Sequence, residues 1–249
     1  MKKIILSLLL LSLAASSVFA LTPKEVLNKA FDASLYMQEG KVTNATFIIE
    51  AKDIIDGVDG TIKTITVVDQ GKWRKDSMTY SGNELAGKQT FINIPQEGTW
   101  VMINNAMMHS YRHEPPSKKT NVTDADSKTI EQIKKIADSA VFVTGDSKSN
   151  DFYVIDVPLG KDSKYRLYVD KTNYTISEVS MSFGDMPVTI KYSDYRKVLG
   201  NHYYPYRIET EASGHKSITE VTSFKVVTSK DVASYFVIPT EQEFKSQKN

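Results

Sequence analysis

The chain has 249 residues, with 31 Lys and Arg against 30 Asp and Glu, so its formal net charge is +1. This balance argues against a nucleic-acid binder, or a binder of anionic membranes, that relies on bulk charge. The absence of cysteine excludes thiol catalysis, disulfide exchange and metal sites built on cysteine.

Residues 1–20 have the pattern of a secretory signal peptide. Lys2 and Lys3 precede an apolar run over 4–13, and Val18-Phe19-Ala20 ends in a small residue of the kind that signal peptidase reads. The run is too short for a membrane span, although an uncleaved anchor helix is the alternative. Leu21 follows the expected cut, and no cysteine is present to carry a lipid. We therefore expect an untethered periplasmic protein of 249 − 20 = 229 residues.

A helix is predicted over residues 23–37. Thr22 and Glu25 have the spacing of a capping box, and Pro23 suits the first helical position. Gly40 follows the predicted end. The apolar side chains of one face recur at helical spacing: Val26, Leu27, Ala30, Phe31 and Leu35.

After this helix the apolar residues alternate with period two, which is typical of β-strands. Strands are predicted over 41–50, 61–69, 71–80, 88–94, 98–104 and 106–112. A second helix is predicted over 127–138. Further strands are predicted over 140–144, 151–157, 164–170, 174–183, 186–196, 203–212 and 216–228.

The end of the chain is predicted to add little to the fold. Residues 232–238 are interpreted as a short turn or strand, and 241–249 as a polar tail that frays. No linker divides the chain, so 21–240 is predicted to be one domain. It is mainly β with α: the evenly spaced strands, about eleven, suggest a single strongly curved antiparallel sheet or a barrel, with helices lying across its concave face.

Few residues suggest catalysis or metal binding. His109 and His113 are four residues apart, which on a strand corresponds to roughly 13 Å, too far for one metal ion. Asp53, Asp56 and Asp59 lack the order of a calcium loop and are interpreted as part of a hairpin turn. No Gly-x-Ser-x-Gly motif or phosphate-binding glycine loop is present. We expect no catalytic residue, metal or cofactor.

Apolar side chains are the more informative pattern. Trp100, Met102, Met107 and Met108 lie within nine residues, and Val179, Met181 and Phe183 form an alternating stripe. Methionine is deformable and suits a cavity that accepts flexible apolar chains. An ordinary hydrophobic core is the alternative for each of these residues.

The second half of the chain resembles a known family through the order of its motifs. Residues 169–176 read Val-Asp-Lys-Thr-Asn-Tyr-Thr-Ile and lead into a strand, and Tyr192-Ser193-Asp194-Tyr195 follows in the next. Gly200 and Tyr204-Pro205 come after it, and Phe236-Val237-Ile238-Pro239 closes the pattern. This order resembles the outer-membrane lipoprotein-sorting proteins, the LolA/LolB-like superfamily, over nearly all of 22–240.

The resemblance implies that the single curved antiparallel sheet of about eleven strands forms an unclosed β-barrel covered by two or three helices. It also implies a helical lid and a hydrophobic cavity that carries lipids or lipoproteins across the periplasm. The helix over 127–138 is the candidate lid. The lipoprotein carriers of the family have an early Arg-Pro-containing stretch, whereas this chain reads Trp73-Arg74-Lys75-Asp76, with Arg74 at the arginine position and no proline. The cavity is predicted to be lined by Phe47, Ile49, Arg74, Ile92, Trp100, Met102, Met107, Val179, Met181 and Phe183.

The leading hypothesis is a monomeric periplasmic carrier of lipid or of acylated lipoproteins. Its expected partners are an inner-membrane exporter and an outer-membrane acceptor. One alternative is an envelope sensor or scaffold of the same fold that binds a protein partner. A secreted hydrolase is the third hypothesis, and no recognisable catalytic constellation supports it.

Overall fold

The computed structural model describes residues 21–34, 45–56, 60–116, 137–158, 163–183 and 186–246. Within these ranges, thirteen strands form one sheet, in which every pairing is antiparallel. The strands are β1 (Thr46–Ile55), β2 (Thr61–Asp69), β3 (Lys72–Ser81), β4 (Glu84–Ile94), β5 (Gly98–Asn105), β6 (His109–Glu114), β7 (Val141–Phe142), β8 (Phe152–Pro158), β9 (Lys164–Asp170), β10 (Ile176–Phe183), β11 (Met186–Leu199), β12 (His202–Ala212) and β13 (His215–Val226).

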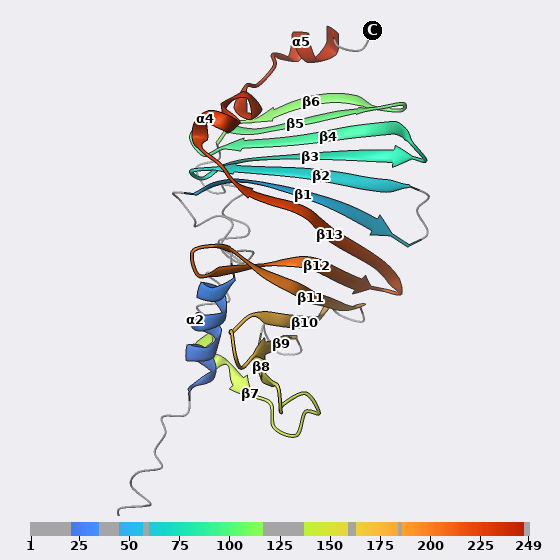
Figure 1. The fold of residues 1–249 in the computed structure, drawn as a ribbon. Coiled ribbons are helices and arrows are strands. Elements are labelled where there is room, and N and C mark those ends of the chain that lie inside the picture. Colours follow the sequence, from blue (N-terminus) through green and yellow to red (C-terminus); the bar gives the residue numbers. More distant parts are fainter. Residues whose placement is uncertain are drawn as a thin grey trace, which may run out of the picture.

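The sheet is a meander with one long-range closure. Its order is β6-β5-β4-β3-β2-β1-β13-β12-β11-β10-β9-β8-β7, so the first and last strands of the chain pair at its centre (Figure 1). The end strands β6 and β7 do not pair with each other within the described residues. The prediction of a mainly β, unclosed antiparallel sheet is confirmed. The sheet has thirteen strands in place of the total of about eleven, and each of them overlaps one of the strand ranges predicted separately.

The first helix, α2 (Pro23–Ala33), begins as predicted. Thr22 Oγ1 accepts a hydrogen bond from the Glu25 amide, and the Glu25 carboxylate accepts one from the Thr22 amide, which completes the capping box. The helix ends before the predicted residue 37, because Ser34 is extended and forms a parallel bridge with Tyr203 on β12. Tertiary pairing thus sets the end of the helix.

Strand register divides the side chains between two faces of the sheet, since paired residues of neighbouring strands share a face. We call the face that α2 covers the α2 face. There the buried side chains of α2 pack on strands β8 to β11, in a cluster of Val26, Leu27, Ala30, Phe31, Ala137, Ile155, Val157, Leu167, Val169, Ile176, Val179 and Tyr192. The opposite face is called the C-terminal face, because the end of the chain covers part of it.

Residues 228–246, the C-terminal segment, lie against β2 to β6, at the other end of the sheet from α2 (Figure 1). The segment contains α4 (Ser229–Val232), the 3₁₀ helix η3 (Ala233–Phe236) and α5 (Glu241–Ser246). Val232 and Phe244 are buried. These helices correct two expectations, a turn or strand over 232–238 and a frayed tail after 240.

The predicted lid helix over 127–138 lies almost entirely outside the described residues. Its last residues belong to the short 3₁₀ helix η2 (Ala137–Ser139), in which Ala137 is buried against the α2 cluster. In the part of the chain that the structure describes, every helix is too short or too polar to span a bilayer.

Candidate functional site

Four of the predicted cavity residues lie on the α2 face. Val179 pairs with Leu167 and belongs to the cluster beneath α2, and Met181 packs against that cluster. Phe47 and Ile49 share a face of β1 and form a second cluster with Ala51, Val68, Tyr204 and Val221. Tyr206 packs on this second cluster and Ile208 on the first, and both occupy the same face of β12. The two clusters therefore form one apolar band.

Four other predicted cavity residues lie on the C-terminal face. Trp73 packs with the Phe47 cluster, so its neighbour Arg74 projects from the opposite side of β3. Arg74 pairs with Ile92, and Ile92 pairs with Trp100. Met102 shares a face of β5 with Trp100. The sheet itself therefore separates these four residues from Phe47, Ile49, Val179 and Met181, and the predicted set does not line one cavity.

The remaining two predicted residues join neither group. Met107 lies in the turn between β5 and β6, where its side chain is 97% exposed. The Asn105 carboxamide oxygen accepts hydrogen bonds from the amides of Met107 and Met108, which holds this turn. Phe183 is the last residue of β10, and its side chain lies outside the description.

The α2 face is hollow over β1 to β5. A pocket of about 440 Å³ opens there, lined mainly by polar side chains, among them Asp53, Thr64, Lys75, Ser77, Thr79 and Gln89. Thr64 pairs with Ser77, and Ser77 pairs with Gln89, so one polar row crosses three strands. Lys75 is exposed and has no ion-pair partner among the described residues. The α2 face thus offers an apolar band and, beside it, a polar hollow.

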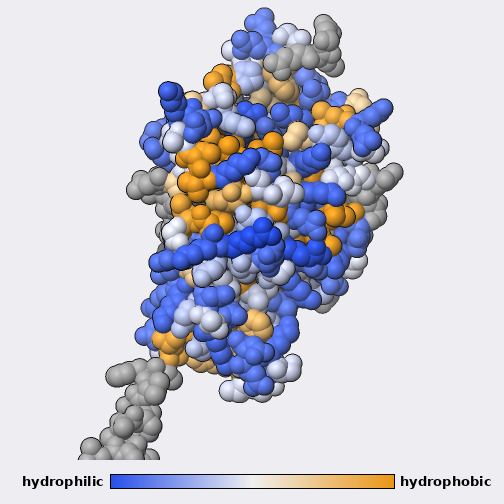
Figure 2. Space-filling model, viewed as in Figure 1, coloured by the Kyte–Doolittle hydropathy of each residue, from blue (hydrophilic) through white to orange (hydrophobic). Residues whose placement is uncertain are grey.

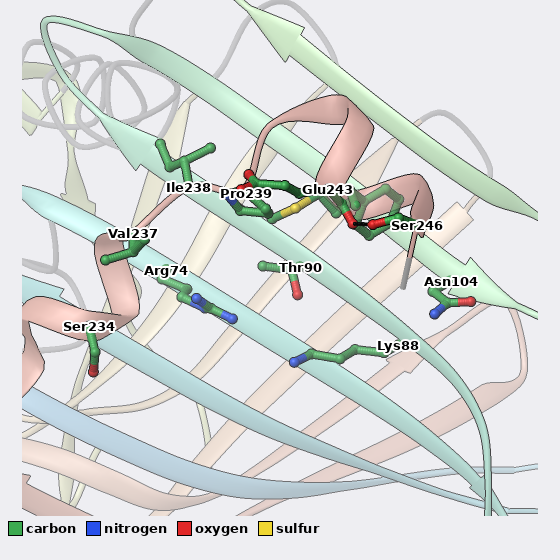
Figure 3. Close-up of a pocket in the computed structure, with 12 residues that line it drawn as sticks. Arg74, Lys88, Thr90, Asn104, Ser234, Val237, Ile238, Pro239, Glu243 and Ser246 are labelled. Carbon is green, nitrogen blue, oxygen red and sulfur yellow. Dashed lines mark hydrogen bonds between the residues drawn. The ribbon is translucent and has the colours of Figure 1, made fainter. Parts of the chain in front are cut away.

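A larger pocket, of about 650 Å³, lies on the C-terminal face between the sheet and the C-terminal segment (Figure 3). Strands β3 to β5 supply its floor, and residues between 234 and 246 supply its opposite wall. Its lining consists of Arg74, Lys88, Thr90, Met102, Asn104, Ser234, Val237, Ile238, Pro239, Glu243, Phe244 and Ser246.

A buried carboxylate organises the polar floor of this pocket. Arg74 donates two hydrogen bonds to Asp76, at 3.1 Å from Nε and 2.9 Å from Nη2, and Thr90 Oγ1 donates a third at 2.7 Å. Lys88 Nζ lies 3.5 Å from the same carboxylate. Burial alone would raise the pKa of Asp76, but these hydrogen bonds and charges outweigh it and lower the pKa below its usual value. Asp76 is therefore a stable anion.

Arg74 also ties the sheet to the C-terminal segment. Its Nη1 donates a 2.8 Å hydrogen bond to the carbonyl oxygen of Tyr235. Nearby, Tyr111 Oη donates to the carbonyl oxygen of Pro239 at 3.1 Å. Arg74 was predicted to line the cavity, and its side chain faces away from the α2 face.

The two histidines of β6 are stacked on aromatic rings. His109 stacks on Phe244 with ring centroids 4.4 Å apart, and His113 stacks on Trp100 at the same separation. Across the ranges that the structure covers, no group of three potential ligand side chains is placed to hold a metal ion. Asp53, from the calcium-like stretch, accepts a hydrogen bond from Thr219, and residues 57–59 lie outside the description.

Sequence reasoning missed the residues that the C-terminal segment contributes. Phe236, Ile238 and Phe244 pack with Ile92, Trp100 and Met102. A usable signal was present, because Thr240 and Glu243 repeat the capping-box spacing of Thr22 and Glu25 and make the same reciprocal hydrogen bonds. Their spacing predicts a helix start inside the supposed tail.

Exposed apolar side chains concentrate in the half of the molecule that carries both pockets. In Figure 2, hydrophobic residues gather over the half that contains β1–β6, and the other half is mainly hydrophilic on the side shown. Exposed large apolar residues of this half are Ile54, Leu85, Met107, Met108 and Val237, with Val226 on the adjoining β13; Val141 and Phe142 are exposed at the other end of the sheet.

No family model matches the chain, and no curated protein matches it either. Among solved structures, an outer membrane lipoprotein-sorting protein domain from Vibrio parahaemolyticus is 12% identical, with 87% of this chain and 97% of that chain covered and a TM-score of 0.49. A LolA superfamily protein from Nitrosomonas europaea is 15% identical, with 90% and 98% covered and a TM-score of 0.48. The MucA/MucB complex of Pseudomonas aeruginosa matches at 10% identity, 85% and 96% coverage and a TM-score of 0.28. The first two matches belong to the family that the sequence resembles.

Proposed function

We propose that this protein is a periplasmic carrier that binds the acyl chains of lipids or lipoproteins on the α2 face of its sheet. The supporting observation is the apolar band of that face. The buried side chains of α2 cover the part over β8 to β11, and the band continues to Phe47 and Ile49 on β1, which are buried as well. The proposal assigns no catalytic residue, and the signal peptide over 1–20 provides the route to the periplasm.

The energetics of acyl chains suit such a face. Burying one methylene group contributes about 0.8 kcal/mol, so a chain of about sixteen carbons gains roughly 12 kcal/mol on leaving water. A fully enclosed cavity would therefore release its ligand very slowly. A band on an unclosed sheet captures part of this free energy, which permits transfer from an exporter to an acceptor.

Native mass spectrometry of the gently purified protein, together with titration of a fluorescent fatty acid, tests the proposal. We expect a co-purified lipid or acyl chain and saturable probe binding. Ala51 lies within the Phe47 cluster, so Ala51→Phe fills the band and should weaken probe binding at least tenfold. Ile48→Phe is the matched control, because Ile48 projects from the opposite face of the same strand.

Circular dichroism of both variants establishes that they fold. Absence of both lipid and probe binding would contradict the carrier function. Equal probe binding by Ala51→Phe and the native protein would contradict the location of the site.

A second function, an envelope sensor or scaffold that binds a protein partner, is favoured by the polar hollow of the α2 face. Its Thr64–Ser77–Gln89 row and exposed Lys75 offer hydrogen bonds and charge that an acyl chain does not use. Affinity capture from an envelope extract tests it. Lys63→Glu is the control, because Lys63 projects from β2 on the face opposite Lys75. If Lys75→Glu loses a stoichiometric protein partner that Lys63→Glu retains, the result supports this function over the carrier.

A further inference from the structure

The pocket beneath the C-terminal segment has the size and shape of a ligand site. Its volume of about 650 Å³ falls within the roughly 300–1,000 Å³ that ligand pockets occupy. One wall is the sheet, and the other is the C-terminal segment. This segment is hydrogen-bonded to the sheet by Ser229, whose hydroxyl donates to Asp69, a residue 160 positions earlier in the chain. The pocket opens on the face opposite α2, so it is separate from the apolar band.

Two cations define the polar end of this pocket. Lys88 and Arg74 project from neighbouring strands, and Figure 3 shows the Lys88 ammonium directed toward Arg74 across the floor. Lys88 forms one ion pair, with Asp76, and its side chain is 41% exposed. An ammonium group has three donors and a guanidinium has five. Donors of both cations therefore remain for an anion that lies between them.

The sheet floor of this pocket carries one excess positive charge. Asp76 neutralises one of the two cations, which leaves an excess of one positive charge. Glu243, on the opposite wall, adds a second negative charge to the lining; its carboxylate lies at the N-cap of α5, where it accepts from the Thr240 amide at 2.8 Å and from the Thr240 hydroxyl at 2.9 Å. The positive charge of the floor thus lies on Arg74 and Lys88, while Asp76 and Glu243 balance it over the lining as a whole.

The other end of the pocket is apolar. Met102 from the sheet faces Ile238, Pro239 and Phe244 from the C-terminal segment. Methionine adapts its shape to flexible chains. An apolar end beside a cationic end is the arrangement that an amphiphile with an anionic head requires.

We propose that this pocket binds a single-chain amphiphile with a carboxylate head, the head lying between Lys88 and Arg74 and the chain lying against Met102 and Phe244. The site does not depend on the carrier function, because it occupies the other face of the sheet. The C-terminal segment forms one wall, so ligand binding also holds that segment in place.

Isothermal titration of the full-length chain with decanoate and with decan-1-ol tests the proposal. The carboxylate should bind at least tenfold more tightly than the alcohol, because only the carboxylate forms charge-assisted hydrogen bonds. Lys88→Met keeps the length of the side chain and removes its charge, and should weaken decanoate binding about tenfold while leaving decanol unchanged. Lys75→Met is the matched control, on the opposite face of the adjacent strand.

Amide chemical shifts of the ¹⁵N-labelled protein locate the ligand, with changes expected at Thr90 and Met102. Val237→Glu provides a second variant, since Val237 is 69% exposed and a substitution there leaves the core intact. Its added carboxylate should also weaken decanoate binding. Undiminished decanoate binding in both variants would overturn the proposal. If Ala51→Phe abolishes decanoate binding and Lys88→Met does not, the α2 face holds the ligand, and this inference fails while the carrier function stands.

Discussion

Asp76 and Arg74 form a largely buried ion pair beneath the C-terminal segment, whereas Asp194 and Arg196 form an ion pair that is exposed to water. The side chains of Arg74 and Asp76 are 17% and 9% exposed, against 56% and 53% for Arg196 and Asp194. A buried carboxylate without partners costs several kcal/mol, while an exposed pair contributes little. The two pairs are therefore a matched test of burial.

We expect Arg74→Ala to lower the free energy of unfolding by about 3 kcal/mol, because it leaves the Asp76 carboxylate with fewer donors. Arg196→Ala should have little effect. Urea unfolding monitored by tryptophan fluorescence measures both. If the two substitutions lowered the free energy of unfolding equally, burial would not be what makes the Arg74–Asp76 pair important for stability.

The same pair predicts the response to acid. The pKa of Asp76 is lowered in the folded state, so its ionised form stabilises the fold above its ordinary value of 3.8, and this contribution is lost as the pH falls through the lower folded value. Stability should therefore decline below about pH 4, and Asp76→Asn should flatten this part of the curve. Urea unfolding from pH 2 to 7 measures this dependence of stability on pH. If Asp76→Asn kept the same decline of stability below about pH 4, Asp76 would not be its source.

His109 and His113 occupy equivalent stacks with different hydrogen bonding. Both ring nitrogens of His109 are buried without a hydrogen-bond partner among the described residues, while His113 Nε2 lies 3.1 Å from the carbonyl oxygen of Glu97. His109→Phe keeps the ring stack and removes two unsatisfied atoms, so we expect a gain of about 1 kcal/mol in unfolding free energy. His113→Phe should lose about 0.5 kcal/mol. Thermal unfolding compares them; destabilisation by His109→Phe would show that its ring nitrogens have a partner.

At the scale of elements, the C-terminal segment is held by a few separated contacts. Val232 and Phe244 are buried near its two ends, and the Arg74–Tyr235 hydrogen bond lies between them. The last helix, α5, has only six residues and would not be stable alone. Its order therefore depends on the burial of Phe244 against the sheet.

We expect Phe244→Ala to raise hydrogen exchange of the α5 amides at least tenfold while exchange in β8 to β12 stays unchanged, because the lost contact is local. Lys245→Ala is the control on the same helix. It removes only an exposed pair with Glu241 and should change exchange less than twofold. Equal exchange in both variants would show that other contacts hold α5.

At the scale of the whole molecule, α2 joins the beginning of the chain to strands formed more than a hundred residues later. Leu27 is fully buried among residues of β8 to β11. Truncating a buried leucine removes its transfer free energy and leaves a cavity. The lost packing free energy comes from the contacts between α2 and strands β8 to β11.

We therefore expect Leu27→Ala to lower the free energy of unfolding by about 3 kcal/mol. The adjacent Asn28 is exposed, and Asn28→Ala should change stability by less than about 0.5 kcal/mol. Differential scanning calorimetry measures both variants. A small effect of Leu27→Ala would mean that α2 contributes little to the stability of the sheet.

Local signals in the sequence predicted the elements well. The capping box placed the start of α2, and period-two alternation placed strands such as β2 and β9 with their bounds, because both signals depend on residues near one another in the chain. The same alternation showed that Trp100 and Met102 share a face of one strand. The number of strands and the short connections between them indicated one antiparallel sheet, curved or closed into a barrel, and the family resemblance implied that it is unclosed.

Tertiary structure decided which face each strand turns toward α2. Alternation relates residues within a strand, but the relation between Arg74 on β3 and Phe47 on β1 depends on the register of the intervening pairings. The sequence by itself therefore determined the strands, the first helix and the apolar stripes. Only the pairing of distant strands decided that the stripes lie on two faces, and only packing against the sheet made the C-terminal segment a wall of the larger pocket.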